Sequence, residues 1–183
     1  MKDQKFLAEV VKDLGPKPRM LVVLFAQPRE DWEAKFAQYQ PEMKSRVPRG
    51  VTLHFELAFP DIFEEQIKRS DIVFIYGGDD HLVTYWLKQF DLPKIWEGQV
   101  VATSSAGSDV LAAHYWTCDW RQCMDGLGIV SIKFLGHFRS DYGSTDSRGP
   151  VDWDAGYAAL AEYGDKNLPI HALEEGDFVV VEA

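Results

Sequence analysis

Ser105 is the residue from which acyl-transfer chemistry can most directly be built. It lies in the segment Val100 to Gly107, between an apolar run and a stretch of small residues. This placement predicts a serine on a sharp strand-to-helix turn, with its hydroxyl exposed and the following amide facing a substrate oxygen. Gly107 fills the position two residues after the serine, while Thr103 stands where glycine is usual. The pattern favours a nucleophilic serine, and an ordinary helix start is the alternative.

A second candidate turn, Gly77-Gly78, ends another apolar run. Acyl transfer needs backbone N–H donors aimed at the developing oxyanion, and a Gly-Gly turn presents its amides unobstructed. Both turns are expected at the carboxyl edge of one sheet, where open α/β sheets bind their ligands. We therefore predict that the amides of Gly78 and Ala106 form an oxyanion hole, with a tight turn that binds nothing as the alternative.

A serine nucleophile needs a base, and His137 is the best placed histidine. It follows a predicted strand and opens a polar loop, so it too is expected at the carboxyl edge of the sheet. Asp119 and Glu175 are the candidate acids that would orient it. Sequence order does not decide between them.

The other histidines and a short acidic cluster give weaker signals. His54 and His171 lie inside predicted strands, which favours structural roles. His81 and His114 are expected on helices beside the two turns, where either can contact a substrate. The run Asp79 to His81 resembles a site for a hard metal ion, yet no accompanying metal or phosphate motif is present. We predict no metal and no cofactor.

The elements that must position these residues alternate between apolar runs and helical patterns. Such alternation is typical of an α/β fold with a mainly parallel sheet and helices on both faces. Strands are expected at Met20–Ala26, Val51–Leu57, Asp71–Tyr76, Gln99–Ser104, Gly128–Phe134, Leu168–Ala172 and Phe178–Val181. Helices are expected at Phe6–Leu14, around Trp32–Tyr39 with Pro41 limiting or kinking the helix, and at Asp61–Arg69, Leu82–Leu87 with a cap from Asp79 or Asp80, Ser105–Ala113 and Asp152–Tyr163. Residues 136–150 are expected to form a loop, and residues 174–177 a turn.

Composition narrows the class of protein. With 183 residues and 20.8 kDa, the chain predicts a single domain over residues 1–183. The net charge of −10 has the wrong sign for binding a phosphate backbone or an anionic membrane. The longest apolar run, Met20–Ala26, is too short to span a bilayer. We expect a cytoplasmic protein that binds neither nucleic acid nor membrane, with Cys118 and Cys123 as reduced thiols.

Taken together, the motifs resemble those of the peptidase E family. These are serine α-aspartyl dipeptidases, grouped with cyanophycinase, whose fold is related to that of class I glutamine amidotransferases. The segments that carry the resemblance are Ile75–Asp79, Thr103–Gly107, Gly136–Phe138 and Leu173–Phe178. The resemblance covers about residues 20–181 and implies a flavodoxin-like three-layer sandwich.

The resemblance also implies roles for individual residues. Ser105 would be the nucleophile, His137 the general base and then acid, and Gly78 with Ala106 the oxyanion hole. Asp119 resembles the aspartate of the family's triad. Glu175 resembles a glutamate that the fold places near the histidine.

Substrate recognition is where the sequence departs from the family. Asp79 stands at a substrate-binding position where the dipeptidases have asparagine, and it resembles the Gly-Gly-Asp of cyanophycinases. The family's G-E-T-R segment after the histidine is replaced by Gly143–Gly149. Arg139 and Arg148 are the candidates to pair with a substrate carboxylate, since arginine binds carboxylates in a bidentate way. Solvated loop arginines are the alternative.

The sequence thus predicts a serine-type hydrolase of small peptides, with N-terminal aspartyl dipeptides as the implied substrates. The alternatives are an inactive amidotransferase-like binding protein and an esterase of the α/β-hydrolase type. Neither the side-chain preference nor the oligomeric state follows from the sequence.

Overall fold

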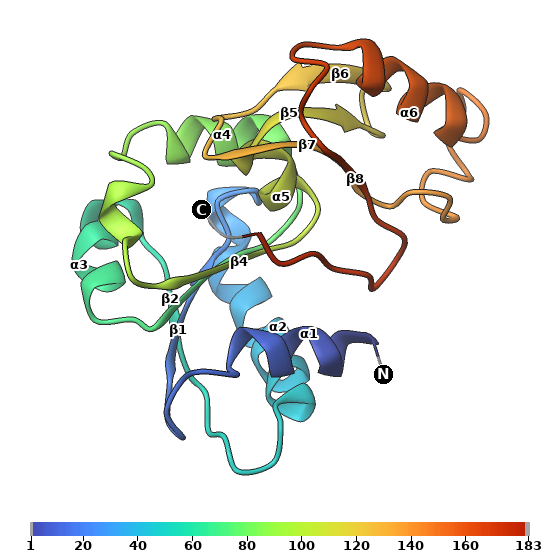
Figure 1. The fold of residues 1–183 in the computed structure, drawn as a ribbon. Helices are drawn as coiled ribbons and strands as arrows, with labels where there is room; N and C mark the ends of the chain where they lie inside the picture. The colour runs from blue at the N-terminus through green and yellow to red at the C-terminus, as the bar shows by residue number, and fades with distance from the viewer. Residues whose placement is uncertain (1, 182–183) are drawn as a thin grey trace. The chain divides into compact units, whose positions relative to one another are not determined.

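The computed structural model describes residues 2–181 and divides into two compact units, residues 1–107 and residues 108–183 (Figure 1). Each unit is built on its own four-stranded sheet. The α/β class is confirmed, but the strands form two sheets where the sequence predicted one. The single domain over residues 1–183 stays a prediction.

The first unit holds a parallel sheet in the order β2-β1-β3-β4. Its strands are β1 (Arg19–Val23), β2 (His54–Leu57), β3 (Ile72–Ile75) and β4 (Val100–Thr103). Its helices are α1 (Lys2–Val10), α2 (Trp32–Arg46), α3 (Phe63–Lys68) and α4 (Asp80–Leu87), with short 3-10 turns at Arg29–Asp31, Pro60–Ile62 and Lys94–Trp96. Helix α5 (Ala106–Leu111) begins in this unit and ends in the next.

Burial of the central strands shows that both faces of this sheet are covered. All four residues of β3, and Met20–Val23 of β1, are buried. On one face, Phe6 of α1 packs against Phe74 at a ring-centroid distance of 5.8 Å. Continuous apolar strands of this kind are typical of a parallel sheet between two helical layers.

The second unit holds a mixed sheet in the order β6-β5-β7-β8. Its strands are β5 (Ala112–Thr117), β6 (Gln122–Asp125), β7 (Val130–Leu135) and β8 (Ile170–Ala172). Strands β5 and β6 form an antiparallel hairpin, while β7 runs parallel to both β5 and β8. Helix α6 (Trp153–Glu162) packs on this sheet through Leu160 against Trp116 and Leu135.

Several predicted boundaries were wrong. The helix predicted over Ser105–Ala113 ends at Leu111, and the β5–β6 hairpin that follows was missed. The predicted strand Phe178–Val181 is not a strand and is part of neither sheet. The opening helix ends at Val10 instead of Leu14. Of the two outcomes expected at Pro41, the end of the helix is not found, because α2 continues through Pro41 to Arg46. Among residues 2–181, no helix is long and apolar enough to cross a membrane.

Candidate functional site

Ser105 stands between β4 and α5 with its backbone in the left-handed region, at φ +48°. A residue with a β-carbon rarely adopts this conformation, and it persists only where the surrounding structure enforces it. The nucleophile turn of serine hydrolases is strained in the same way. The predicted sharp strand-to-helix turn is therefore present at Ser105.

Two glycines allow this turn by leaving room where a β-carbon would collide. A β-carbon at Gly77 would lie 2.7 Å from the Cβ of Ser105. One at Gly107 would lie 2.6 Å from the carbonyl oxygen of Ile75. The glycine two residues after the serine thus lets α5 approach the end of β3. Gly77 does the same for the serine side chain itself.

Hydrogen bonds hold the Gly77-Gly78 turn against the serine turn. The amide of Gly77 donates to Ser104 Oγ at 3.1 Å, and its carbonyl accepts from Gln27 Nε2 at 2.6 Å. Gly78 adopts φ +144°, and a β-carbon there would lie 2.3 Å from Gln27 Nε2. Glycine is therefore required at both positions.

The two predicted oxyanion donors both belong to the first unit. Ala106 is the first residue of α5, where backbone N–H groups have no acceptor within the helix. Within residues 2–181, the neighbours of the Gly78 amide are engaged, because Gly77 donates to Ser104 and Asp79 donates to Ala26 O at 2.8 Å. Their role in binding an oxyanion stays a prediction.

Asp79 caps helix α4. Its Oδ1 accepts from the amide of Leu82 at 2.9 Å, as the sequence predicted for this position. A substrate contact through Asp79 stays a prediction. Asp80 is buried beside His81, with 3.9 Å between Asp80 Oδ1 and His81 Nε2.

His137 lies in the second unit, two residues after β7, with φ +59°. The contact between its Nδ1 and Glu175 Oε1 measures 2.5 Å. The amide of Phe138 donates to Leu173 O at 2.9 Å, which ties the histidine segment to the chain just before the Glu175 turn. A carboxylate on Nδ1 selects the tautomer that leaves Nε2 free of a proton, as a general base requires.

Asp119, the other candidate acid, occupies the tip of the β5–β6 hairpin. Its Oδ1 accepts from the hydroxyl of Tyr142 at 3.0 Å. The Tyr142 ring in turn stacks on His137, with centroids 4.3 Å apart and planes inclined by 18°. Of the two candidates, Glu175 is the one hydrogen-bonded to His137, and Asp119 is linked to it through Tyr142.

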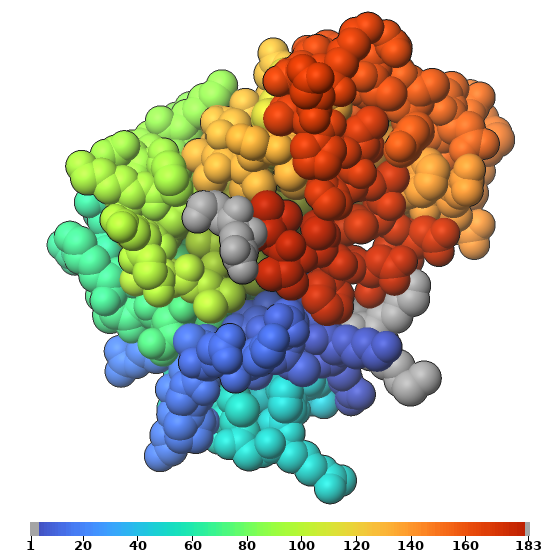
Figure 2. Space-filling view, in the orientation of Figure 1, coloured from blue at the N-terminus to red at the C-terminus, as the bar shows by residue number. Residues whose placement is uncertain are grey.

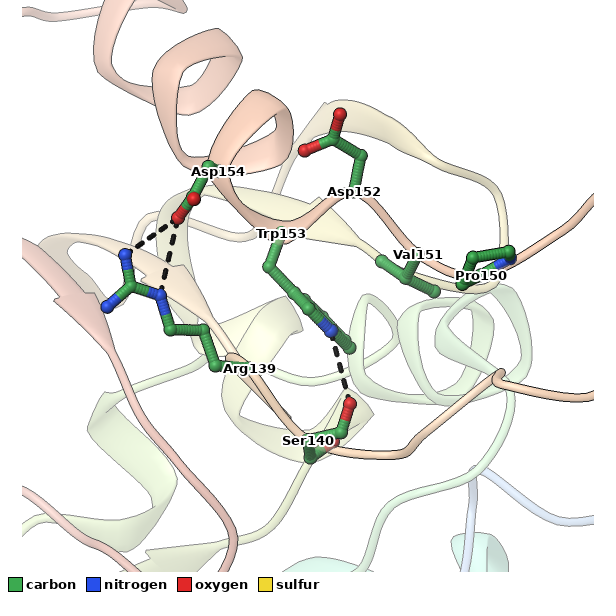
Figure 3. A pocket seen from close by; sticks show the side chains of 7 residues that line it. All are labelled: Arg139, Ser140, Pro150, Val151, Asp152, Trp153 and Asp154. Carbon is green, nitrogen blue, oxygen red and sulfur yellow. Dashed lines mark hydrogen bonds and ion pairs between the residues drawn. The ribbon is translucent and has the colours of Figure 1, made fainter.

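Arg139 and Arg148 are both paired with aspartates of the same unit. Arg139 bonds Asp154 at 2.8 Å, on the rim of an open pocket of about 620 Å³ between the loop and the start of α6 (Figure 3). Figure 2 shows this loop beside α6 on the surface, in neighbouring orange shades. Arg148 pairs with Asp146 and lowers the pKa of that carboxyl well below its usual range. A role for either arginine in binding a substrate carboxylate stays a prediction.

The remaining histidines include one correction. His114 was expected on a helix, but it lies in β5. Its Nδ1 lies 2.7 Å from Asp125 Oδ1, and its Nε2 accepts from the amide of Asp165 at 3.2 Å. Both ring nitrogens are therefore engaged in structure. His81 lies on α4, while His54 and His171 lie in strands, as predicted.

The sequence interpretation missed two residues that support the candidate groups. Gln27 holds the Gly-Gly turn, and Tyr142 stacks on His137. The available signals were the polar Gln27 directly after the buried apolar run Met20–Ala26, and the aromatic Tyr142 in a Gly- and Ser-rich loop. Within residues 2–181, no group of three His, Cys, Asp or Glu side chains is arranged to hold a metal ion.

Comparison with solved structures identifies the fold. A peptidase from an acI-B1 Actinobacterium superposes with a TM-score of 0.61 at 21% identity, covering 95% of this chain and 74% of the other. A protein from Listeria monocytogenes EGD-e, provisionally named peptidase E, superposes with a TM-score of 0.59 at 12% identity, covering 94% and 86%. The chain has a peptidase E-like fold. The three-layer, flavodoxin-like arrangement predicted from the sequence is thereby confirmed.

At these identities the likeness shows the fold alone. No model of a protein family matches the sequence, and a search of the curated proteins finds no match.

Proposed function

We propose that the protein is a serine-type peptidase of small peptides. The observation that carries the proposal is the strained backbone of Ser105 on a strand-to-helix turn. Glycines stand at the two points where a β-carbon would collide with this turn or with the end of β3, namely Gly77 and Gly107. The bond between His137 and Glu175, and a fold shared with proteins named as peptidases, support it. Strain of this kind is retained where it presents a reactive group.

The proposed reaction needs no group beyond the chain's own residues and water. Ser105 Oγ attacks the scissile carbonyl carbon while His137 Nε2 takes the hydroxyl proton. The amides of Gly78 and Ala106 bind the oxyanion of the tetrahedral intermediate. The C–N bond then breaks as His137 returns the proton to the leaving amine, and water releases the acyl group by the reverse sequence of proton transfers. Glu175 stabilises the imidazolium that forms in each half.

Peptides with a free N-terminus are the proposed substrate class, with N-terminal aspartyl dipeptides as the family's implied example. Residues 108–183, which include His137, hold thirteen Asp and Glu but five Lys and Arg. This excess of carboxylates favours a substrate ammonium group. An aspartyl side chain, in contrast, must displace Asp154 from Arg139 or Asp146 from Arg148.

The test is hydrolysis of dipeptides with N-terminal Asp, Ala or Lys, and of matched aminoacyl anilides and esters. Ser105→Ala should lower kcat by about 10³-fold or more, while Ser45→Ala, in α2, serves as the matched control. An unchanged rate in Ser105→Ala contradicts the mechanism. Turnover of esters alone identifies an esterase, and a folded wild type that cleaves neither amide nor ester indicates a binding protein.

A further inference from the structure

Tyr142 covers one face of the His137 ring. The two rings lie nearly parallel, at 18°, with centroids 4.3 Å apart. Such stacking contributes about 0.5–1.5 kcal/mol beyond the burial of the rings, and it restricts rotation of both of them. The Tyr142 hydroxyl donates to Asp119 Oδ1 at 3.0 Å. Burial, together with this carboxylate, raises the pKa of the phenol.

The loop between the two rings is held by its own hydrogen bonds. The amide of Ser140 donates to the carbonyl of His137 at 3.0 Å, and the amide of Tyr142 donates to Ser140 Oγ at 3.1 Å. The indole of Trp153, at the start of α6, donates to Ser140 O at 3.2 Å. The position of Tyr142 relative to His137 is therefore set by the backbone as well as by stacking.

Asp119 is also held in place through its backbone. Its carbonyl oxygen accepts from Arg148 at 2.8 Å, and Arg148 also pairs with Asp146. Asp119 thus accepts the hydrogen bond of the Tyr142 hydroxyl at the tip of the β5–β6 hairpin. Arg148 ties this tip to the loop that carries Tyr142. The Tyr142 ring is held at both its backbone and its hydroxyl.

Two directions define the orientation of an imidazole, and each has its own support here. Glu175, bound to Nδ1, sets where the nitrogens point within the ring plane. Stacking on Tyr142 sets the tilt of that plane. We infer that Tyr142 is a positioning residue for His137, and that Asp119 acts on the histidine only through the Tyr142 hydroxyl. This inference rests on the proposed function, in which His137 transfers the proton.

A double-mutant cycle tests the order Asp119, Tyr142, His137. Tyr142→Phe keeps the stacked ring and loses the hydroxyl, while Asp119→Ala removes the acceptor. Each should lower kcat about tenfold with KM changed less than about twofold, and the double variant should be no slower than either single one. Asp119→Asn keeps an oxygen acceptor and should restore kcat to within about threefold of wild type. A double variant in which the two losses multiply overturns the inference, because Asp119 then acts by another route.

A spectroscopic measurement separates this inference from the proposed function. The measurement needs no turnover and is made in the Ser105→Ala variant. There, the proton between His137 Nδ1 and Glu175 should give a proton NMR signal downfield of the amides. His137→Gln assigns that signal by removing it. Tyr142→Leu should broaden or abolish it, whereas Tyr157→Leu, a tyrosine of almost equal exposure on α6, should leave it unchanged.

The two failures are then distinct. A signal that is the same in Tyr142→Leu as in the parent overturns the positioning role, whatever the activity. A signal that depends on Tyr142 in a protein without hydrolase activity supports the positioning of His137 and contradicts the proposed function.

Discussion

The turn around Ser105 and the loop around His137 are built in different ways. The serine turn is made of backbone packed against backbone, with Gly77, Gly78 and Gly107 at points where a β-carbon would collide. The histidine is held by side chains, namely Glu175 at Nδ1 and Tyr142 on the ring face. Close backbone packing allows a single conformation and tolerates few substitutions. Exposed side-chain pairs, in contrast, are individually weak.

The two units differ in net charge and in the polarity of their buried strands. Residues 1–107 hold sixteen acidic and fourteen basic residues, so the excess of thirteen over five in residues 108–183 accounts for most of the net charge of −10. Strand β3, which pairs with the strand that leads into the serine turn, is entirely apolar and buried. The corresponding strand before His137, β7, contains the fully buried Lys133. The nearly neutral first unit presents the expected nucleophile, and the more acidic second unit presents the expected base.

The largest effect is expected at the serine turn, from Gly77→Ala. The added β-carbon would lie 2.7 Å from Ser105 Cβ and 3.0 Å from Ser104 O, so the turn must shift. We expect kcat/KM to fall about 100-fold or more, because misplaced catalytic groups lose most of their effect. Gly15→Ala is the control, since a β-carbon at Gly15 has no atom within 4 Å. A Gly77→Ala protein as active as Gly15→Ala shows that the turn does not carry the chemistry.

A smaller effect is expected at the histidine, from Glu175→Gln. The amide keeps the shape of the carboxylate but no longer favours the imidazolium, so kcat should fall about 10- to 50-fold. Thermal unfolding should be unchanged, because the Glu175 side chain is 62% exposed. Glu174→Gln, in the same turn, is the control. If Asp119→Asn lowers kcat more than Glu175→Gln does, Asp119 is the functional acid.

This contrast also explains what could be predicted from sequence. The serine turn depends on local spacing, so Gly77, Gly78, Ser105 and Gly107 were all recognisable before the structure. The partners of His137 come from a hairpin and a turn far along the chain, and no local pattern ranks Glu175 above Asp119. Contacts between side chains that are far apart in the chain produce no periodic pattern in the sequence.

The missed β5–β6 hairpin shows the same limit in the fold. Ala112 and Ala113 continue the small-residue pattern of α5, so the helix was extended over them and His114 was misplaced with them. The β-branched and aromatic run Tyr115–Thr117 was the signal for a strand. In the other direction, Phe178–Val181 has a strand-like composition but pairs with no strand of either sheet. Strand propensity yields a strand only where the backbone pairs with a neighbouring strand.

Lys133 is fully buried in the second unit. Lys133 Nζ donates to the carbonyls of Leu160 at 2.8 Å and Ala161 at 3.0 Å, in the last turn of α6. Lys133→Met should leave both carbonyls without this donor and lower the free energy of unfolding by about 1–3 kcal/mol. Lys166→Met, an exposed lysine paired with Glu162, is the control and should cost less than about 0.5 kcal/mol. Equal stabilities in a urea titration would show that β7 and α6 do not depend on the buried amine.

The two thiols of the hairpin, Cys118 and Cys123, are expected to react slowly in the folded protein. Burial, with a contribution from Asp119, raises the pKa of Cys118 to about 12, and burial raises that of Cys123 as well. Because the thiolate is the reactive form, alkylation by iodoacetamide at pH 8 should be at least about 100-fold slower in the folded protein than in urea. Cys118→Ser and Cys123→Ser assign the rates to the individual residues. Labelling of Cys118 at the rate found in urea would mean that the hairpin opens readily. Asp119 could then not hold the Tyr142 hydroxyl in place, and the histidine would depend on Glu175 alone.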